Sequence, residues 1–346
     1  MAHRLLRRER TCRRSDSHRL GEGGETSFGA SGRRRSPSAR CGSCCQVAGQ
    51  KERGPVIQAL FEAMRPYQWV KNLLVFAPLI FAQKLYDRPS QMGALVAFAA
   101  FCCVASGIYL LNDLMDLERD RRHPKKKNRP LPSGRLSPAV AGIAVFVLVG
   151  SGLGLAQWRG FLILPLVYFL INVAYSLKLK HLVILDAMCI AIGFLLRVYA
   201  GGVAIHVPVS SWLVLCTFFV ALLLAFCKRR HELFVLGEEE ASGHRKSLEH
   251  YSFAFLDQMI APLGALTVMA YAAYTTSPAA VANFGPKRAH LLVWTVPFVV
   301  YGIFRYLFLV HMRSEGGDPT RLLLKDLPTL LNILGWMGTS LWIVYF

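Results

Sequence analysis

Long apolar runs alternate with short polar segments over most of the chain after residue 65. An apolar run of about twenty residues is long enough to cross a bilayer as a helix. The pattern predicts nine such helices, over residues 67–86, 91–112, 138–156, 160–177, 182–204, 210–228, 254–275, 289–311 and 328–346. We therefore expect an all-α integral membrane protein with a nine-helix membrane domain over residues 54–346.

The basic residues between these runs indicate which ends of the helices face the cytoplasm. The basic loops follow the second, fourth, sixth and eighth predicted spans, at residues 119–129, 178–180, 228–246 and 313–325. Cytoplasmic loops of membrane proteins carry an excess of Lys and Arg. We therefore expect a multi-pass protein of the cell membrane whose active-site loops are cytoplasmic.

Composition and charge support a membrane protein and indicate which classes of molecule it binds. Hydrophobic residues make up 53% of the chain, and the formal net charge is +19. On a soluble protein this charge would suggest nucleic acid, but here the basic residues lie in the N-terminal segment and on one side of the predicted membrane domain. Residues 1–53 are rich in Arg, Ser and Gly and lack apolar periodicity, which predicts a basic disordered tail. We expect anionic lipid and phosphorylated substrates as partners, and no nucleic acid.

An acidic motif follows the second predicted span, in the stretch NDLMDLERDRRHPKKKNRPLPSG at residues 112–134. If residues 112–120 are helical, Asn112, Asp116 and Asp120 are spaced four apart and share one face with Asp113. Mg²⁺ prefers oxygen ligands and, when held by one or two carboxylates, usually takes others from a phosphate. The spacing therefore predicts that Asn112, Asp113, Asp116 and Asp120 hold Mg²⁺ on a diphosphate, with the three aspartates catalytic.

Basic side chains in two loops are expected to bind the same anionic substrate. In the first loop these are His123, Lys125, Lys127 and Arg129. The loop after the sixth span carries Lys228, Arg229, Arg245 and Lys246, together with one carboxylate, Glu232. For the cations alone, a loop that is basic only because it is cytoplasmic is the alternative.

Polar residues at and inside the predicted spans extend this site into the membrane. Asp186 and Arg197 are eleven residues apart, close to three helical turns, so both project from one face of the fifth span. We expect Asp186 near the cytoplasmic mouth and Arg197 deeper in the same cleft; the alternative is a polar seam between helices. Lys71, Tyr175 and Lys178, near span ends, reach either the substrate or the lipid headgroups.

Five ordered segments resemble the UbiA superfamily of intramembrane prenyltransferases. They are RPYQWVKNLLVFAPLIFA, the 112–134 stretch, YSLKLKHLVILDAMCIAIGFLLRVYAGG, KRRHELFVLG with HRKSLEHYS, and FRYLFLV with GGDPTRLLLKD. The similarity is closest to the branch of decaprenyl-phosphate phosphoribosyltransferases. It implies a nine-helix UbiA-like bundle and Mg²⁺-dependent transfer of 5-phosphoribosyl from phosphoribosyl pyrophosphate to a polyprenyl phosphate, with release of pyrophosphate.

Two other activities are compatible with the sequence. An aromatic prenyltransferase shares the first motif but uses a polyprenyl diphosphate as the electrophile. That branch of the superfamily has a second Asp-rich motif after helix six, whereas this chain has only Glu232, residues 238–240 and Asp257 there. The other alternative is a lipid-phosphate transporter whose basic loops bind headgroups without chemistry.

Overall fold

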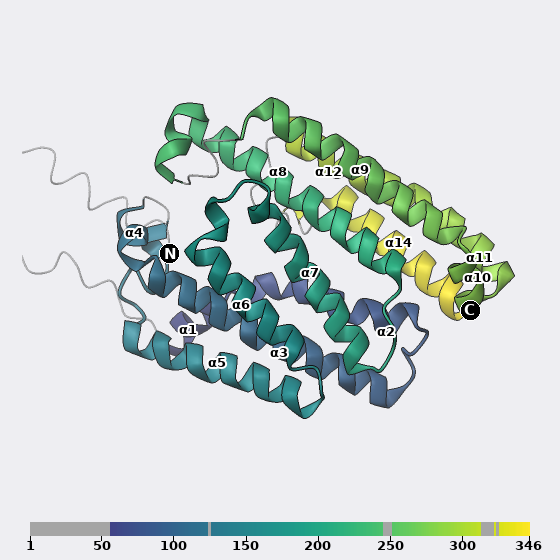
Figure 1. Cartoon of the computed structure of the whole chain (residues 1–346), viewed down its shortest axis with the longest axis horizontal. Helices are drawn as coiled ribbons and strands as arrows, with labels where there is room; N and C mark the ends of the chain where they lie inside the picture. Colours follow the sequence, from purple (N-terminus) through teal and green to yellow (C-terminus); the bar gives the residue numbers. More distant parts are fainter. Residues whose placement is uncertain (1–55, 124–125, 245–250, 313–321, 323–324) are drawn as a thin grey trace, which may run out of the picture. The chain divides into compact units, whose positions relative to one another are not determined.

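The computed structural model describes residues 56–123, 126–244, 251–312, 322 and 325–346. Within these ranges every regular element is a helix (Figure 1). The predicted tail at residues 1–53 lies outside the described residues, as do Lys125, Arg245 and Lys246. The helices are α1 Val56–Met64, η1 Pro66–Phe76, α2 Ala77–Phe81, α3 Arg88–Met115, α4 Leu117–Arg122, η2 Lys126–Asn128, α5 Pro138–Trp158, α6 Ile163–Leu177, η3 Leu179–His181, α7 Leu185–Ala204, α8 Ser211–His244, α9 Phe253–Thr275, α10 Pro278–Phe284, α11 Pro286–Leu292, η5 Val293–Thr295, α12 Val296–Met312 and α14 Leu327–Tyr345.

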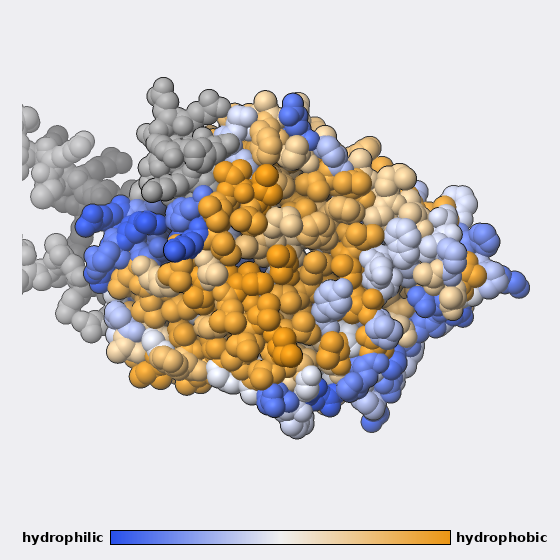
Figure 2. Space-filling view, viewed as in Figure 1, coloured by the Kyte–Doolittle hydropathy of each residue, from blue (hydrophilic) through white to orange (hydrophobic). Residues whose placement is uncertain are grey.

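The all-α membrane fold is confirmed, and most predicted spans correspond to a helix. Seven helical segments of the described chain are long and apolar enough to cross a membrane, and α6 is a shorter apolar helix. Figure 1 shows α3 beside α5 and α8 beside α9, with α7 between the two groups. In Figure 2 an apolar belt covers the middle of the visible face and separates polar surface near α4 from polar surface at the opposite end. The protein is a multi-pass membrane protein.

The first predicted span is not a single long α-helix. The described chain therefore does not show the expected nine membrane-spanning helices as nine continuous α-helices. Its residues form the 3₁₀-helix η1 followed by the short helix α2. A 3₁₀-helix rises about 2.0 Å per residue against about 1.5 Å in an α-helix. Together η1 and α2 therefore cover roughly 30 Å, about the thickness of the hydrocarbon layer.

A glycine on α7 explains how closely this first segment packs. A Cβ atom at Gly201 would collide with the backbone carbonyl of Val75, which belongs to η1. Only a residue without a side chain lets the two backbones approach this far. Gly201 therefore fixes the position of η1 against α7.

A buried ion pair joins α7 to α8. Arg229 Nε lies 2.6 Å from Asp186 Oδ2, and both side chains are fully buried. Arg229 also pairs with Glu232 and donates to Tyr175 Oη at 3.1 Å, while Tyr251 Oη donates to Asp186 Oδ1 at 2.9 Å. Burial raises the pKa of the Tyr251 phenol above its usual range, so its hydroxyl remains a hydrogen-bond donor.

These contacts correct the expected position of Asp186. Asp186 and Arg197 do lie on one helix, but Arg229 and Tyr251 cover Asp186 completely. A buried carboxylate needs such partners because burial disfavours its charged form. Asp186 and Arg229 therefore link α7 to α8, and their expected contact with a substrate stays a prediction.

Replacing Gly201 with alanine is expected to lower the free energy of unfolding by about 1–3 kcal/mol, because η1 must move away from α7. Titration of the detergent-solubilised protein with SDS, followed by circular dichroism, measures this. Gly150→Ala in α5 is the matched control, since a Cβ there meets nothing within 4 Å. Equal losses in the two variants would contradict the close packing at Gly201.

Replacing Asp186 with alanine is expected to cost about 3–5 kcal/mol of stability, because it removes a buried partner of Arg229. The same titration tests this. Glu118→Ala removes the solvent-exposed partner of Arg121, and its cost is expected to stay below about 1 kcal/mol. A loss at Asp186 no larger than that at Glu118 would refute the structural role of the buried pair.

Candidate functional site

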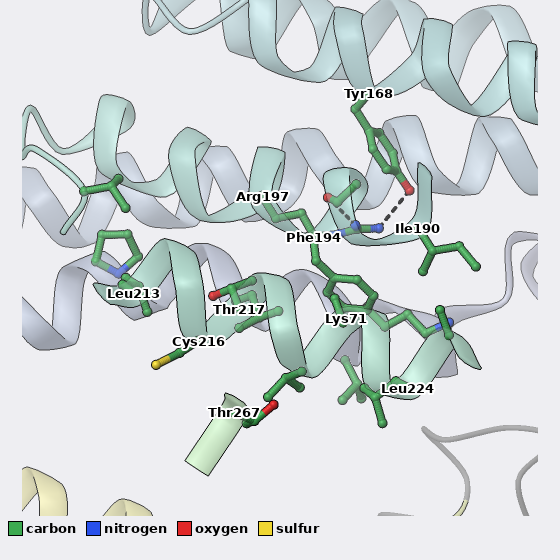
Figure 3. Close-up of a pocket in the computed structure, with 18 of the residues that line it drawn as sticks. Lys71, Tyr168, Ile190, Phe194, Arg197, Leu213, Cys216, Thr217, Leu224 and Thr267 are labelled. Carbon is green, nitrogen blue, oxygen red and sulfur yellow. Dashed lines mark hydrogen bonds between the residues drawn. The ribbon is translucent and has the colours of Figure 1, made fainter. Parts of the chain in front are cut away.

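A cavity of about 1200 Å³ lies among η1, α3, α6, α7, α8, α9 and α14. We call it the large cavity; Figure 3 shows part of its lining. Its walls are mainly apolar, and they include four cationic side chains: Arg65, Lys71, Arg197 and Lys228. No Asp or Glu is among the described residues that line it. A cavity of this character favours an anion with a long apolar part.

Arg197 carries the most deeply buried charge in the large cavity. Its side chain is only 5% exposed and donates hydrogen bonds to Asn72 Oδ1 at 2.7 Å, Gly193 O at 2.6 Å and Tyr168 Oη at 2.8 Å. Figure 3 shows the bond to Tyr168, whose ring also lies 4.6 Å from the guanidinium carbon. These hydrogen-bonding partners are all neutral, so they orient the guanidinium without cancelling its charge.

The first segment lines the large cavity with residues spaced by three. Arg65, Gln68, Lys71 and Leu74 all belong to the lining. Three residues make one turn of a 3₁₀-helix, so Gln68, Lys71 and Leu74 follow one line along η1, and Arg65 directly precedes it. Tyr67 and Val70 line the cavity from the neighbouring line. The lining continues to Gln83, Ser210 and Asn283 at the other end of the cavity.

Three more of the predicted residues line the large cavity, and Lys178 does not. Lys228 and Tyr175 lie in its wall, as does Asn112. Asn112 Oδ1 accepts a hydrogen bond of 2.6 Å from Ser176 Oγ. The large cavity therefore brings together residues of the first, second, fourth, fifth and sixth predicted spans.

A second, small cavity of about 420 Å³ lies beside the acidic motif. Arg65 and Tyr67 line both cavities, and Asp113, Lys126 and Arg129 line only the small one. Arg65 was not among the predicted site residues, although an arginine directly before Pro66 at the start of the first span is a signal for it. Arg65 thus lies at the boundary between the two cavities.

Asp113 and Asp120, which we call the acidic pair, are buried and joined by one guanidinium. They are 3% and 1% exposed. Arg129 Nη1 lies 3.2 Å from Asp113 Oδ1 and 2.7 Å from Asp120 Oδ2. Arg65 Nη2 is 2.5 Å from Asp113 Oδ1, and Lys126 Nζ is 3.6 Å from Asp120 Oδ1.

The expected continuous helix through Asn112, Asp116 and Asp120 is interrupted at Asp116, although the backbone bonds from Asp116 N to Asn112 O (3.0 Å) and from Asp120 N to Asp116 O (2.8 Å) keep the helical spacing. Helix α3 ends at Met115, Asp116 adopts a non-helical conformation, and α4 begins at Leu117. Asp116 is 38% exposed and lies 3.8 Å from Arg119. Arg129 bridges Asp113 and Asp120, whereas Asp116 lies nearer to solvent.

Other predicted residues of the two loops lie outside the described cavity linings. His123 Nδ1 accepts a hydrogen bond from the Lys126 backbone nitrogen at 3.3 Å, and Lys127 is exposed in η2. Glu232 lies 3.9 Å from Lys228 Nζ in addition to its contact with Arg229. None of these three, His123, Lys127 or Glu232, lines either cavity.

The acidic pair fits Mg²⁺ that arrives on a phosphate, and it does not fit a closed protein metal site. Among the described residues no group of three or more His, Cys, Asp or Glu side chains could hold a metal ion. Mg²⁺ needs only one or two carboxylates when phosphate and water supply the other ligands. Asp120 Oδ1 is buried and lacks a hydrogen-bond partner, so it is available as one such ligand.

Comparison with known proteins identifies the family. The UbiA prenyltransferase family matches residues 73–325. Decaprenyl-phosphate phosphoribosyltransferase from Mycolicibacterium smegmatis is 34% identical over 301 residues, covering 84% of this chain and 94% of that protein. The enzyme of the same name from Corynebacterium glutamicum is 33% identical over 309 residues, covering 86% and 91%.

A solved structure shares the fold. A UbiA homologue from Archaeoglobus fulgidus bound to GPP and Mg²⁺ superposes with a TM-score of 0.63 at 18% identity, covering 83% of this chain and 100% of that one. The chain belongs to the UbiA prenyltransferase family and is a membrane-embedded transferase.

Proposed function

We propose that the protein transfers 5-phosphoribosyl from phosphoribosyl pyrophosphate to a polyprenyl phosphate and releases pyrophosphate. The observation that carries this proposal is the large apolar cavity with four cations and no lining carboxylate, joined at Arg65 to a buried acidic pair. An anionic lipid fits the first cavity, and a diphosphate with Mg²⁺ fits the second. The names of the relatives support the same pair of substrates.

The acceptor lipid would place its phosphate among the cations of the large cavity. Lys71, Arg197 and Lys228 supply positive charge there, and the apolar walls supply room for an isoprenoid. A guanidinium or ammonium held in a low-dielectric cavity binds a phosphate more strongly than it would in water. A lipid monophosphate therefore matches both the charge and the polarity of this space.

The donor would bind with its diphosphate beside the acidic pair. Asp113 and Asp120 would hold Mg²⁺, and when bound this ion would neutralise negative charge that builds up on the leaving diphosphate. Arg65, Lys126 and Arg129 surround the same carboxylates and can donate to phosphate oxygens. Asn112 and Asp116 belong to the same motif, and their roles as metal ligands are part of this proposal.

The reaction needs no general base. A phosphate monoester has its second pKa near about 6, so the acceptor oxygen is already anionic at neutral pH. This oxygen forms a bond to C1 of the ribose while the bond from C1 to the diphosphate oxygen breaks. The bonding electrons leave with pyrophosphate, and attack from the opposite face inverts C1.

The surroundings of Glu232 in α8 and Asp257 in α9 support phosphoribosyl transfer over aromatic prenylation. Asp257 is paired with Arg230 at 2.6 Å and with His311 at 3.2 Å, and Glu232 pairs with Arg229. Neither acidic residue lines the large cavity. These two residues therefore do not form a second carboxylate site for a prenyl diphosphate at the large cavity. The basic loops on this side are proposed to be cytoplasmic, where a soluble phosphorylated donor is accessible.

Replacing Asp113 or Asp120 with asparagine is expected to lower kcat/KM for phosphoribosyl transfer at least about 100-fold, because each removes one charged ligand of the diphosphate site. The assay follows label from radiolabelled phosphoribosyl pyrophosphate into extracted lipid, using membranes with polyprenyl phosphate and Mg²⁺. EDTA is expected to abolish the labelled lipid.

The matched control for these variants is Glu118→Gln, which removes an exposed carboxylate from the same motif. It is expected to retain the wild-type rate. Wild-type membranes that form no labelled lipid, but prenylate an aromatic acid from polyprenyl diphosphate, would overturn the proposal in favour of an aromatic prenyltransferase.

Replacing Lys71 with methionine is expected to raise the KM for polyprenyl phosphate about tenfold or more, because a charged hydrogen bond is worth about 1.5–3 kcal/mol. The KM for phosphoribosyl pyrophosphate is expected to change less. Lys287→Met, an exposed lysine outside both cavities, serves as the control. An unchanged lipid KM in Lys71→Met would remove Lys71 from the acceptor site.

A further inference from the structure

The cations around the acidic pair outnumber its carboxylates. Asp113 and Asp120 contribute two negative charges, and Arg65, Lys126 and Arg129 contribute three positive charges. The cluster of these five side chains, which we call the ionic cluster, therefore has a net charge of plus one. Each carboxylate is in direct contact with a guanidinium before any ligand is present.

We infer that the ionic cluster prevents a divalent cation from binding alone, so that metal and phosphate bind together. Arg65 is the positioning residue: its guanidinium leaves Asp113 and binds the phosphate instead. This inference rests on the proposed function for the identity of the phosphate compound. It adds a binding order, and it assigns a role to a residue outside the acidic motif.

Electrostatics disfavours the metal on its own. A divalent cation would raise the charge of the ionic cluster from plus one to plus three, in a place where both carboxylates are almost fully buried. Like charges repel strongly in such a low-dielectric environment. Arg65 and Arg129 already occupy one oxygen of each carboxylate, Asp113 Oδ1 and Asp120 Oδ2, so a metal would compete with the two guanidiniums for these oxygens.

A phosphate removes both obstacles. Its negative charge offsets the metal, and its oxygens accept hydrogen bonds from the guanidiniums that the carboxylates release. The displaced arginines then bind the anion, while the carboxylates become available to the metal. Metal and anion thus increase each other's affinity, as linkage requires of two coupled ligands.

The position of Arg65 suits this exchange. Its backbone is left-handed, with φ 55° and ψ 61°, a conformation uncommon for a residue other than glycine. Its guanidinium contacts Asp113 and lies 5.2 Å from the centre of the Tyr109 ring. Because Arg65 lines both cavities, a change of rotamer could turn its charge from Asp113 toward an anion without moving a helix.

The test measures Mn²⁺ binding to the full-length, detergent-solubilised protein without lipid or phosphoribosyl donor. Electron paramagnetic resonance distinguishes free from bound Mn²⁺. The wild type is expected to bind Mn²⁺ weakly, and Arg65→Gln at least about tenfold more tightly, because one competing charge has been removed. Arg121→Gln is the matched control, since its arginine is exposed and pairs with Glu118; its affinity is expected to equal that of the wild type.

A second measurement uses radiolabelled inorganic pyrophosphate at saturating Mn²⁺. Here Arg65→Gln is expected to bind pyrophosphate at least about tenfold more weakly than the wild type, so the variant gains metal affinity and loses anion affinity. A protein damaged in folding would lose both. Arg129→Gln repeats the two measurements at the other guanidinium and is expected to shift both affinities in the same directions.

The outcomes separate this inference from the proposed function. Equal or weaker Mn²⁺ binding in both Arg65→Gln and Arg129→Gln would overturn the inference even if phosphoribosyl transfer is observed. Opposite shifts in metal and pyrophosphate affinity would support it even if the transfer assay fails, because neither measurement contains the lipid or the ribose.

Discussion

A charge inside the membrane-spanning layer needs a partner, and this constraint organises the structure. Asp186 and Arg229 satisfy it by pairing with each other, with Tyr175, Glu232 and Tyr251 completing their contacts. The cost of burying each charge is thereby offset by the other. This pair connects α7 to α8, and the large cavity lies among the same helices.

Arg197 meets the same constraint differently. Asn72, Gly193 and Tyr168 supply oxygen acceptors, but the hydrogen bonds that orient this arginine come from neutral groups. One helix thus carries two buried charges with different functions. The charge paired with a charge stabilises the fold, whereas the charge held by neutral acceptors faces a cavity that an anion can enter.

The sequence predicted much of the fold because apolar length is a strong signal. The spans after the first correspond to helices of the structure, and Lys71, Arg197 and Lys228 do face one cavity. Charge and helical spacing along a single segment were enough for these results. Asp113 and Arg129 were also expected near one ligand, and they lie in direct contact.

The failures concern features that depend on tertiary contacts. Nothing in the spacing of Asn112, Asp116 and Asp120 shows that the helix ends at Met115, since the motif is compatible with a continuous helix. Asp186 faces Arg229, which lies 43 positions further along the chain, and only the packed helices show this contact. The close approach at Gly201 likewise depends on which backbone lies opposite.

The 3₁₀ geometry of η1 has a consequence for the wall of the large cavity. Side chains three apart lie in a straight row at intervals of about 6 Å. Here the row runs from Gln68 through Lys71 to Leu74, with Arg65 directly before the helix, and all four line the large cavity. An α-helix with the same sequence would rotate these positions around its axis. The first segment therefore gives the wall of the large cavity a straight polar edge that ends at an apolar side chain, Leu74.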